Sequence, residues 1–290
     1  MKKIVVEVGS TVTKVDQYDG NNVTRLNEVT IFFKKNYSEE NKIKESDFTK
    51  LIQIVNELKT NYQDIYVCGT SIFRTLSDSE KTEFLDQFKN KTGCDFHIIS
   101  QEQESELTVV GATRNIDSDK VCVMIGGGGS TEIAIFDGTT IESANTQIGV
   151  VDVMKQFPDL GNDIATTSLE EVKNYIKEHL NLPKEKSDIL ILAGGGHEKF
   201  ARNSGIVYES NDLYEDSAAP IMMDIENRIK ETERYYKEIS LDEIRSNSND
   251  PDWWNATRAM CAFVLVVAEA IGAKYIIPTN IGMVYGIISK

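Results

Sequence analysis

Residues 121–136, VCVMIGGGGSTEIAIF, place four consecutive glycines and a Ser-Thr pair between two apolar segments. Folding a run of glycines has a large conformational-entropy cost, and a plain hairpin rarely needs one. Glycine lets an anion approach the backbone, where N–H groups and neighbouring hydroxyls can donate to phosphate oxygens. The pattern therefore predicts two strands joined by a phosphate-binding loop made of Gly127, Gly128, Gly129, Ser130 and Thr131.

A second turn of the same kind lies near the N-terminus, in residues 4–15, IVVEVGSTVTKV. Gly9, Ser10 and Thr11 separate two β-rich segments there, so they form a second predicted phosphate loop. Glu7 interrupts the preceding apolar segment, and a buried carboxylate needs a partner or a metal ion. The repeated Gly-Ser-Thr turn predicts that the chain is an internal repeat of structure.

Each half is predicted to open with three strands joined by tight turns and to continue with alternating helices and strands. In the first half, the predicted strands are 4–8, 11–18, 22–33, 65–68 and 96–99, and the predicted helices are 46–59, 79–91 and 102–111. In the second half, the predicted strands are 121–125, 132–136, 140–145, 189–193 and 275–278, and the predicted helices are 150–157, 168–180, 220–237, 251–271 and a last one beyond the final strand.

This order of elements predicts two α/β domains, residues 1–115 and 116–290, that face each other across a cleft. The last helix is expected to pack back on the first domain. A length of 290 residues agrees with two domains, since single cores seldom grow so large. A single large doubly wound sheet is the structural alternative.

The net charge of −15, from 31 Lys and Arg against 46 Asp and Glu, limits the classes of partner. An acidic surface repels nucleic acid and anionic membranes, so neither is expected as a partner. The same charge is unfavourable for a long polyanionic substrate unless positive potential is concentrated at the site.

The cysteines and the apolar segments predict a cytoplasmic protein. The four cysteines stand apart from each other without a C-x-x-C pair, which is typical of buried thiols in a reducing compartment. The most apolar stretch, residues 259–268, is about half the ~20 residues that a membrane span requires. It is predicted to be a buried core helix.

Four segments together resemble a known family: IGGGGSTEIAIFDG, EVGSTVTKV, GTSIFRTLSD and TGCDFHIISQEQESELTVVGA. In this order and spacing they look like the exopolyphosphatase and guanosine pentaphosphate phosphohydrolase family, in its short two-domain form. The resemblance extends to the end of the chain, AEAIGAKYIIPTNIGMVYGII. It implies an α/β fold of two ribonuclease H-like (actin-like ATPase) domains, with mixed sheets flanked by helices and a cleft between the domains.

The resemblance also implies a mechanism and site residues. In this family a carboxylate orients water for attack on a terminal phosphoryl group, while Mg²⁺ and an arginine neutralise phosphate oxygens. Glu104 matches the catalytic glutamate, Arg74 the phosphate-clamping arginine, and Glu132 a second acidic residue. Glu7 and Glu132 would hold Mg²⁺ or Mn²⁺. The implied substrate is a small phosphoanhydride, polyphosphate or a pppGpp-like nucleotide, and family analogy allows a homodimer.

The chain departs from the family pattern at its acidic positions. Glu7 stands where the family usually has Asp, and the family's Asp-Ile before the glycines is replaced by Met124-Ile125 or Ile125-Gly126. Taken without the family, Glu104 would belong to a solvated helix face. Two alternatives therefore stay open: a catalytically weakened phosphate-binding or sensing protein, and an actin-like ATPase or kinase.

Overall fold

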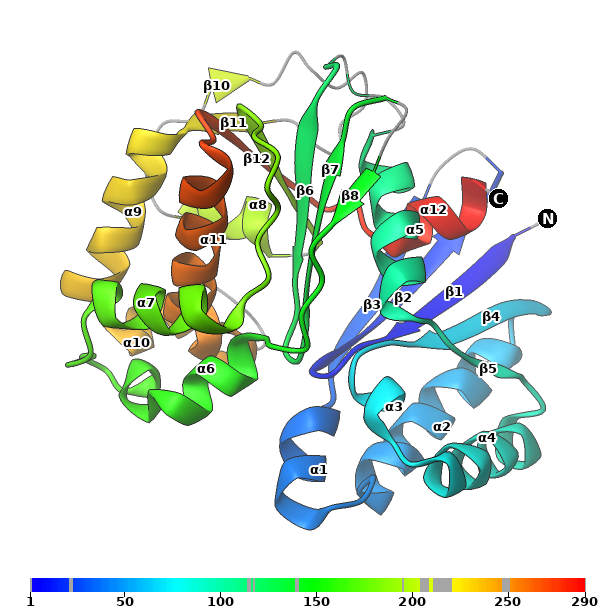
Figure 1. Cartoon of the computed structure of the whole chain (residues 1–290). Helices are drawn as coiled ribbons and strands as arrows, with labels where there is room; N and C mark the ends of the chain where they lie inside the picture. Colours follow the sequence, from blue (N-terminus) through cyan, green and yellow to red (C-terminus); the bar gives the residue numbers. More distant parts are fainter. Residues whose placement is uncertain are drawn as a thin grey trace. The chain divides into compact units, whose positions relative to one another are not determined.

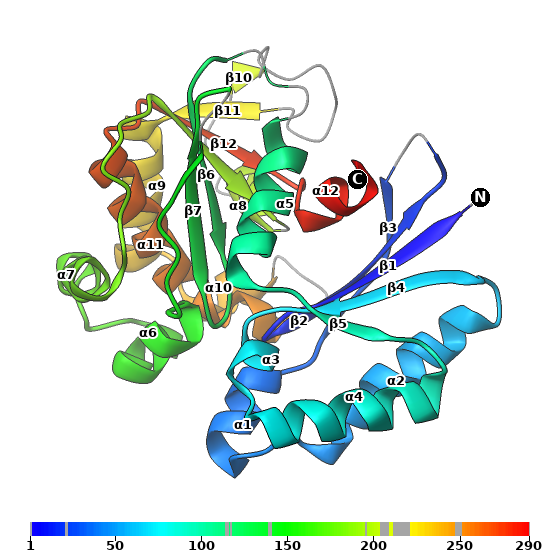
Figure 2. The same ribbon diagram turned by 45° about the vertical axis from the view of Figure 1, so that its right-hand side comes forward.

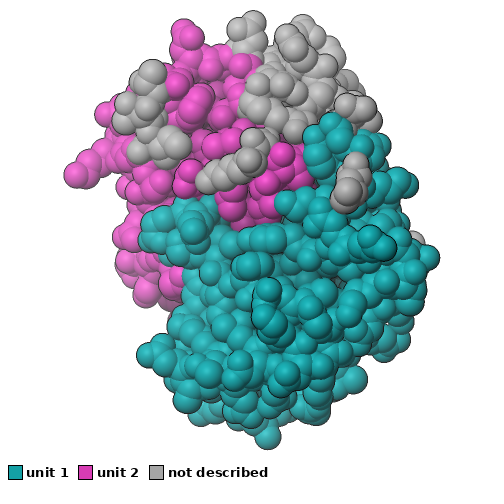
Figure 3. Space-filling model, turned by 90° about the vertical axis from the view of Figure 1, so that its right-hand side faces the viewer, with its two compact units in different colours: residues 1–104, 127–129 teal, residues 105–126, 130–290 magenta. Residues whose placement is uncertain are grey.

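The computed structural model describes residues 2–20, 23–113, 116, 118–138, 141–194, 196–203, 209–210, 221–246 and 251–289. The chain forms two compact units, which are coloured separately in Figure 3. The first contains Met1–Glu104 and Gly127–Gly129, and the second contains Ser105–Gly126 and Ser130–Lys290. The predicted domains, 1–115 and 116–290, divide the chain at a different residue, and that boundary stays a prediction.

The first unit is built on a five-stranded mixed sheet of order β3-β2-β1-β4-β5. Three antiparallel strands form a meander, and two further strands add parallel to the first of them. The strands are β1 (Lys3–Val8), β2 (Val12–Tyr18), β3 (Val23–Thr30), β4 (Asp64–Gly69) and β5 (Phe96–Ile98).

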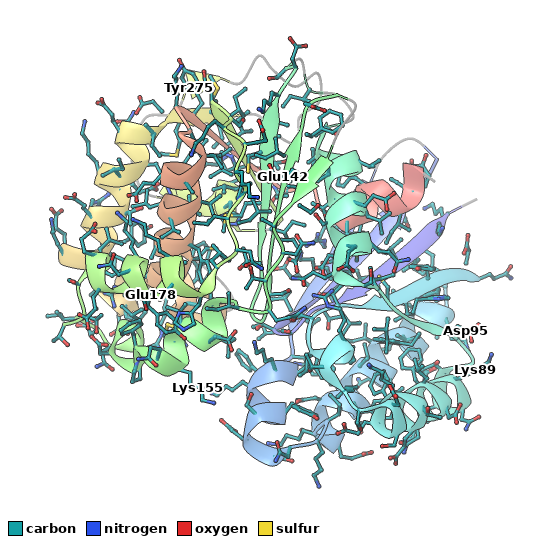
Figure 4. All side chains as sticks on the ribbon, in the orientation of Figure 1. Lys89, Asp95, Glu142, Lys155, Glu178 and Tyr275 are labelled. Atoms are coloured by element: carbon teal, nitrogen blue, oxygen red, sulfur yellow. The ribbon has the colours of Figure 1, made fainter. Side chains whose placement is uncertain are left out.

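Helices pack on one face of this sheet. The helices are α1 (Phe33–Glu40), α2 (Glu45–Lys59), α3 (Ile72–Thr75) and α4 (Asp78–Thr92), and α2 and α4 lie side by side (Figures 1 and 2). Since side chains alternate along a strand, Ile4, Val6 and Val8 enter the core that these helices share, and Glu7 projects from the opposite face. At the surface, Lys89 and Asp95 form an ion pair of 2.8 Å (Figure 4).

The second unit contains a seven-stranded mixed sheet of order β10-β11-β12-β9-β6-β7-β8. Its strands are β6 (Val121–Gly126), β7 (Thr131–Phe136), β8 (Ile141–Ser143), β9 (Ile189–Ala193), β10 (Glu209–Ser210), β11 (Ile221–Asp224) and β12 (Tyr275–Thr279). Within β8, Glu142 accepts hydrogen bonds from two backbone N–H groups, those of Lys184 and Glu185, and its side chain is labelled in Figure 4.

Helices cover both faces of the second sheet. One face packs against α11, which contacts both α7 and α9; the other packs against α5 and α12. The helices are α5 (Gln101–Thr113), α6 (Val150–Gln156), α7 (Leu169–His179), α8 (His197–Asn203), α9 (Ile225–Lys237), α10 (Leu241–Ser246), α11 (Thr257–Ile271) and α12 (Met283–Ser289), with 3₁₀ turns η1 (Pro158–Gly161) and η2 (Pro251–Ala256).

The internal repeat predicted from the two Gly-Ser-Thr turns is confirmed by the strand order. In both units the order is third, second, first, fourth and fifth strand of the repeat: β3-β2-β1-β4-β5 in one and β8-β7-β6-β9-β12 in the other. The antiparallel and parallel pairings also correspond. The alternative of a single large sheet is wrong.

One segment in the described part of the chain, Trp254–Ile271, is long and apolar enough to span a membrane. It is 72% buried, and α11 supplies much of the core between α7 and the sheet. The segment therefore acts as a core helix, as the sequence predicted.

Two predicted elements are corrected. The strand predicted for residues 22–33 ends at Thr30, because Phe33 starts α1 and buries its ring 5.2 Å from that of Phe73. The helix predicted for residues 220–237 begins only at Ile225. The residues before it form β11, which pairs with β12, and Asp224 caps α9 by accepting a 2.7 Å bond from the Asn227 N–H.

Candidate functional site

The first predicted phosphate loop and residues Gly127–Gly129 of the second lie together within the first unit. A side chain added at Gly128 would place its Cβ 2.4 Å from Thr11 Oγ1 and 3.4 Å from Ser10 Cβ. The turn at Gly9 is closed by a 2.9 Å hydrogen bond from its N–H to the Val12 carbonyl. A Cβ at position 128 would force the Thr11 side chain to shift, because the first turn occupies the space that it would need.

The last two residues of the glycine-rich loop belong to the second unit. Ser130 is buried there. Thr131 pairs with Thr146 through both backbone groups, at 2.9 Å each, and donates its hydroxyl to the Ile148 carbonyl at 2.8 Å. The Thr131 hydroxyl thus has a structural partner, and the phosphate-binding role of these two residues stays a prediction.

Arg74 and Glu104 form a buried ion pair. Arg74 is the third residue of the short helix α3, and its Nη1 donates to Glu104 Oε2 at 2.6 Å and to the Ile99 carbonyl at 3.3 Å. Glu104 lies in the first turn of α5 but is only 8% exposed, so it does not lie on a solvated helix face. Burial raises the pKa of Glu104 above its ordinary value, although the Arg74 charge and hydrogen bond act in the opposite direction.

Glu7 belongs to the same cluster of charges. Glu7 pairs with Lys14, its direct partner across the β1–β2 ladder, at 3.3 Å. The negative charge of Glu7 contributes to the raised pKa of Glu104. Cys68 of β4 is the direct neighbour of Glu7 across the β1–β4 ladder. Burial raises the pKa of the Cys68 thiol, and the negative charges of Glu7 and Glu104 raise it further. Glu7, Lys14, Arg74 and Glu104 therefore form one charged cluster in the first unit.

Glu132 lies in the second unit in an apolar row. It is the second residue of β7 and only 1% exposed. Its direct cross-strand neighbour is Ile125, and the next residue along the row is Ala193 of β9. Met124 contributes to the core against α11. The positions at which the resemblance expects an aspartate are thus filled by apolar side chains.

These residues do not fit a resident Mg²⁺ or Mn²⁺. Mg²⁺ takes oxygen ligands, usually one or two carboxylates together with phosphate and water. The carboxylate of Glu7 is paired with Lys14, and the row around Glu132 offers no second carboxylate. No group of three or more His, Cys, Asp or Glu suited to a metal ion occurs among the residues that the structure describes. Glu7 and Glu132 would suit only a divalent cation that arrives already bound to a phosphate ligand. The predicted Mg²⁺ or Mn²⁺ therefore stays a prediction.

Three residues near the loops escaped the sequence analysis. Lys14 could have been found from the hairpin, because a two-strand ladder around Gly9 and Ser10 places it opposite Glu7. Ser71 shares a short segment with Arg74, and its side chain reaches Gly129. Lys34 donates to the Gly129 carbonyl at 3.2 Å, and no sequence signal marked it because the helix that carries it was not predicted.

Comparison with known proteins gives the following similarities. The model of the Ppx/GppA phosphatase family matches residues 12–239. The structure is similar to an exopolyphosphatase from Cytophaga hutchinsonii, with a TM-score of 0.79, 14% identity, and coverage of 100% of this chain and 97% of that chain. It is also similar to the PPX-GPPA enzyme of Aquifex aeolicus, with a TM-score of 0.72, 19% identity, and coverage of 100% and 99%.

An exopolyphosphatase-like protein gives a TM-score of 0.75 at 16% identity, with coverage of 99% of this chain and 96% of that chain. A search of curated proteins found no match. At these identities the structural likeness concerns the fold, and it confirms the predicted class of two mixed sheets flanked by helices.

Proposed function

Because this chain belongs to the Ppx/GppA phosphatase family, we propose that it is a phosphohydrolase that removes the terminal phosphate of a phosphoanhydride. The proposed substrates are polyphosphate and pppGpp-like nucleotides. The family match covers most of the chain, and the similar structures include an exopolyphosphatase. These findings support hydrolase chemistry at the level of the family, and the substrate is our proposal.

The observation that carries the proposal is the buried carboxylate of Glu104 beside Arg74. A general base works best when its pKa lies near the working pH, and enzymes raise glutamate pKa values by burial. Burial raises the pKa of Glu104 in this way. In the proposed mechanism, Glu104 orients a water molecule and accepts its proton while the water oxygen forms a bond to the terminal phosphorus. The bond from that phosphorus to the bridging oxygen breaks, so inorganic phosphate is released and the shortened phosphoanhydride leaves with the bridging oxygen.

The cations and the turns of the first unit have supporting roles in this mechanism. The Arg74 guanidinium can grip phosphate oxygens in a bidentate manner. The N–H groups of Ser10 and Thr11 and of the Gly127–Gly129 turn would hold the non-transferred oxygens, since the Gly9 N–H already donates to the Val12 carbonyl. Positioning and charge stabilisation of this kind account for most of phosphoryl-transfer catalysis.

The experiment is a phosphate-release assay on the full chain with tripolyphosphate, long polyphosphate, pppGpp and ATP, each with Mg²⁺, with Mn²⁺ and with chelator. We expect release from at least one of them, and loss of about 100-fold or more in Glu104→Gln, as expected when a general base is removed. Glu106→Gln is the matched control, because Glu106 is exposed on the same helix. Normal turnover in Glu104→Gln would remove Glu104 from the mechanism.

A second candidate function is a binding or sensing protein that has lost turnover. The apolar pair Met124 and Ile125, beside Glu132, favours it, because the metal-dependent chemistry implied by the resemblance needs a carboxylate there. Calorimetry would then show a phosphorylated ligand binding without phosphate release. Rapid hydrolysis of that ligand would dismiss this candidate.

The proposal also includes the cellular location, the substrate class and the partners of the protein. We propose a cytoplasmic protein with a small-molecule phosphoanhydride substrate, without nucleic-acid or membrane partners. Its net charge of −15 supports the last two points. A homodimer is proposed by family analogy alone, and light scattering at micromolar concentration would test it.

A further inference from the structure

Three polar side chains from separate segments of the first unit surround Gly129. A Cβ added there would lie 2.6 Å from Ser71 Oγ, 2.6 Å from Lys34 Cδ and 2.9 Å from Ser10 Oγ. A Cβ here would force one or more of these side chains to shift, because real Cβ atoms essentially never make such short contacts. Two hydroxyls and a lysine stem therefore meet at the backbone of the glycine-rich loop.

Ser10 and Ser71 each show a further feature that is typical of a binding site. Ser10 is 4% exposed, and its Oγ has no hydrogen-bond partner in the described part of the chain. Buried hydroxyls are normally hydrogen-bonded, so an exception indicates a ligand or a water molecule. Ser71 has φ 48° and ψ −100°, a strained backbone conformation for a residue with a side chain. Strain of this kind gathers at ligand sites.

Lys34 donates hydrogen bonds to both predicted phosphate loops. Its Nζ donates to the Gly129 carbonyl at 3.2 Å, and its backbone N–H donates to the Ser10 carbonyl at 3.1 Å. A lysine ammonium group carries three N–H donors and a compact positive charge. The charge of Lys34 is thereby held at the point where Ser10 and Ser71 meet Gly129.

The charges around the turns favour an anion. The cluster described above contains two ion pairs, Glu7–Lys14 and Glu104–Arg74. Lys34, whose Nζ and backbone N–H are held by Gly129 and Ser10, adds a further cation beside the turns, in a chain whose net charge is −15. Each of the two carboxylates is already paired with a cation, and no group of three or more His, Cys, Asp or Glu suited to a metal ion occurs among the residues that the structure describes.

We propose that Lys34, with the hydroxyls of Ser10 and Ser71, binds the terminal phosphate of a linear phosphoanhydride, and that its ammonium group supplies the positive charge that a divalent cation supplies in a metal-dependent site. The proposal rests on the proposed function and adds to it a binding residue and a means of charge neutralisation. It follows that the phosphate ligand binds without divalent metal.

Isothermal titration calorimetry of the full chain with sodium tripolyphosphate, in EDTA and in Mg²⁺, tests the proposal. We expect the wild type to bind in EDTA, and Lys34→Met to raise Kd about ten-fold or more, as loss of a charge-assisted hydrogen bond implies. Lys34→Arg keeps the charge and should stay within about three-fold of the wild type. Lys35→Met is the matched control, because Lys35 is the next residue on α1 and is exposed.

The salt dependence of Kd separates direct binding from a purely structural role of Lys34. A lysine that contacts phosphate contributes to the dependence of log Kd on log salt, so this slope becomes shallower in Lys34→Met. An unchanged slope would show that Lys34 only supports the loop and would overturn the proposal. If Lys34→Met does not fold, as judged by circular dichroism, Lys34→Gln replaces it in the same comparison.

The remaining outcomes keep this proposal apart from the proposed function. Wild-type binding that requires Mg²⁺, or equal Kd values for the wild type and Lys34→Met, overturns the role of Lys34 while phosphate release with Mg²⁺ can still stand. Absence of both binding and phosphate release, with every phosphoanhydride and with either metal, refutes the proposed function and this proposal together.

Discussion

Glu104 experiences two opposing influences on its ionisation. Burial disfavours the carboxylate form, whereas the positive charge of Arg74, 2.6 Å away, favours it. The net result is that the pKa of Glu104 is raised, and the negative charge of Glu7 raises it further. This balance suits a group that must accept a proton near neutral pH yet remain ionised in the resting enzyme.

The first prediction, at this scale, concerns the pH profile of Arg74 variants. Removing the positive charge in Arg74→Met removes the influence that lowers the pKa of Glu104, so that pKa rises further. Because the base acts only when ionised, the acidic limb of kcat/KM should move to higher pH, by about 1–3 units for the loss of one close charge. Arg74→Lys should move it less.

The measurement is the initial rate of phosphate release from tripolyphosphate between pH 4 and pH 9, for the wild type and both variants. A lower kcat/KM alone would fit the loss of any phosphate contact, so the position of the limb is the informative quantity. An acidic limb at the same pH in all three proteins would show that Arg74 does not control the ionisation of the base.

At the scale of elements, glycines permit close packing of α12 on α5. A Cβ at Gly286 would lie 2.0 Å from the Leu107 carbonyl oxygen, and one at Gly111 would lie 2.8 Å from Tyr285 Cβ. The obstacle at Gly286 is backbone, so no change of rotamer can remove it. The facing glycines thus fix how closely these two helices approach over the second sheet.

The second prediction is that Gly286→Ala destabilises the protein despite the better helix propensity of alanine. That gain is about 1 kcal/mol, whereas overpacking costs about 1–3 kcal/mol and more against rigid backbone. We expect a net loss of about 2 kcal/mol in the free energy of unfolding. Urea titration followed by circular dichroism would measure it.

Gly282→Ala is the control for this prediction, because a Cβ there meets no atom within 4 Å. Its free energy of unfolding should stay within about 0.5 kcal/mol of the wild type. Equal stability of the two variants would contradict the close approach of α12 to α5.

At the scale of the whole molecule, one buried arginine joins distant segments of the second unit. Arg258 is 1% exposed, and its guanidinium donates to five backbone carbonyls at 2.7–3.1 Å. Burial lowers its pKa, and the carbonyls compensate for lost hydration. The acceptors are Leu160, Asn162, Asp163, Tyr235 and Ile239.

The third prediction is that Arg258→Met weakens the second unit selectively. The substitution leaves buried carbonyls without donors, and we expect a loss of about 3 kcal/mol or more. Hydrogen exchange followed by mass spectrometry should show faster exchange in peptides from α9 and α11, with little change in β1 and β4.

Arg234→Met serves as the control for Arg258→Met, since the Arg234 side chain on α9 is 41% exposed. It should leave exchange in both units close to that of the wild type. If hydrogen exchange in Arg258→Met were as much faster in β1 and β4 as in α11, the prediction that Arg258 stabilises only the second unit would be wrong.

The sequence by itself determined the architecture of each unit. Strand and helix periodicity placed most elements within a few residues, since the alternation of apolar side chains depends on local geometry. The duplicated Gly-Ser-Thr turn revealed the internal repeat, and the resemblance named the family. The errors at α1 and β11 arose where tertiary contacts outweigh local pattern: the ring of Phe33 meets Phe73, and β11 pairs with β12.

Only the tertiary structure decided the environment of the candidate site. That Glu104 is buried against Arg74 and that Lys34 reaches Gly129 are consequences of contacts between residues far apart in the chain. Charge, burial and hydrogen bonding at a site depend on such neighbours, and sequence spacing does not encode them. The residue types were therefore readable in advance, whereas their ionisation and partners required the fold.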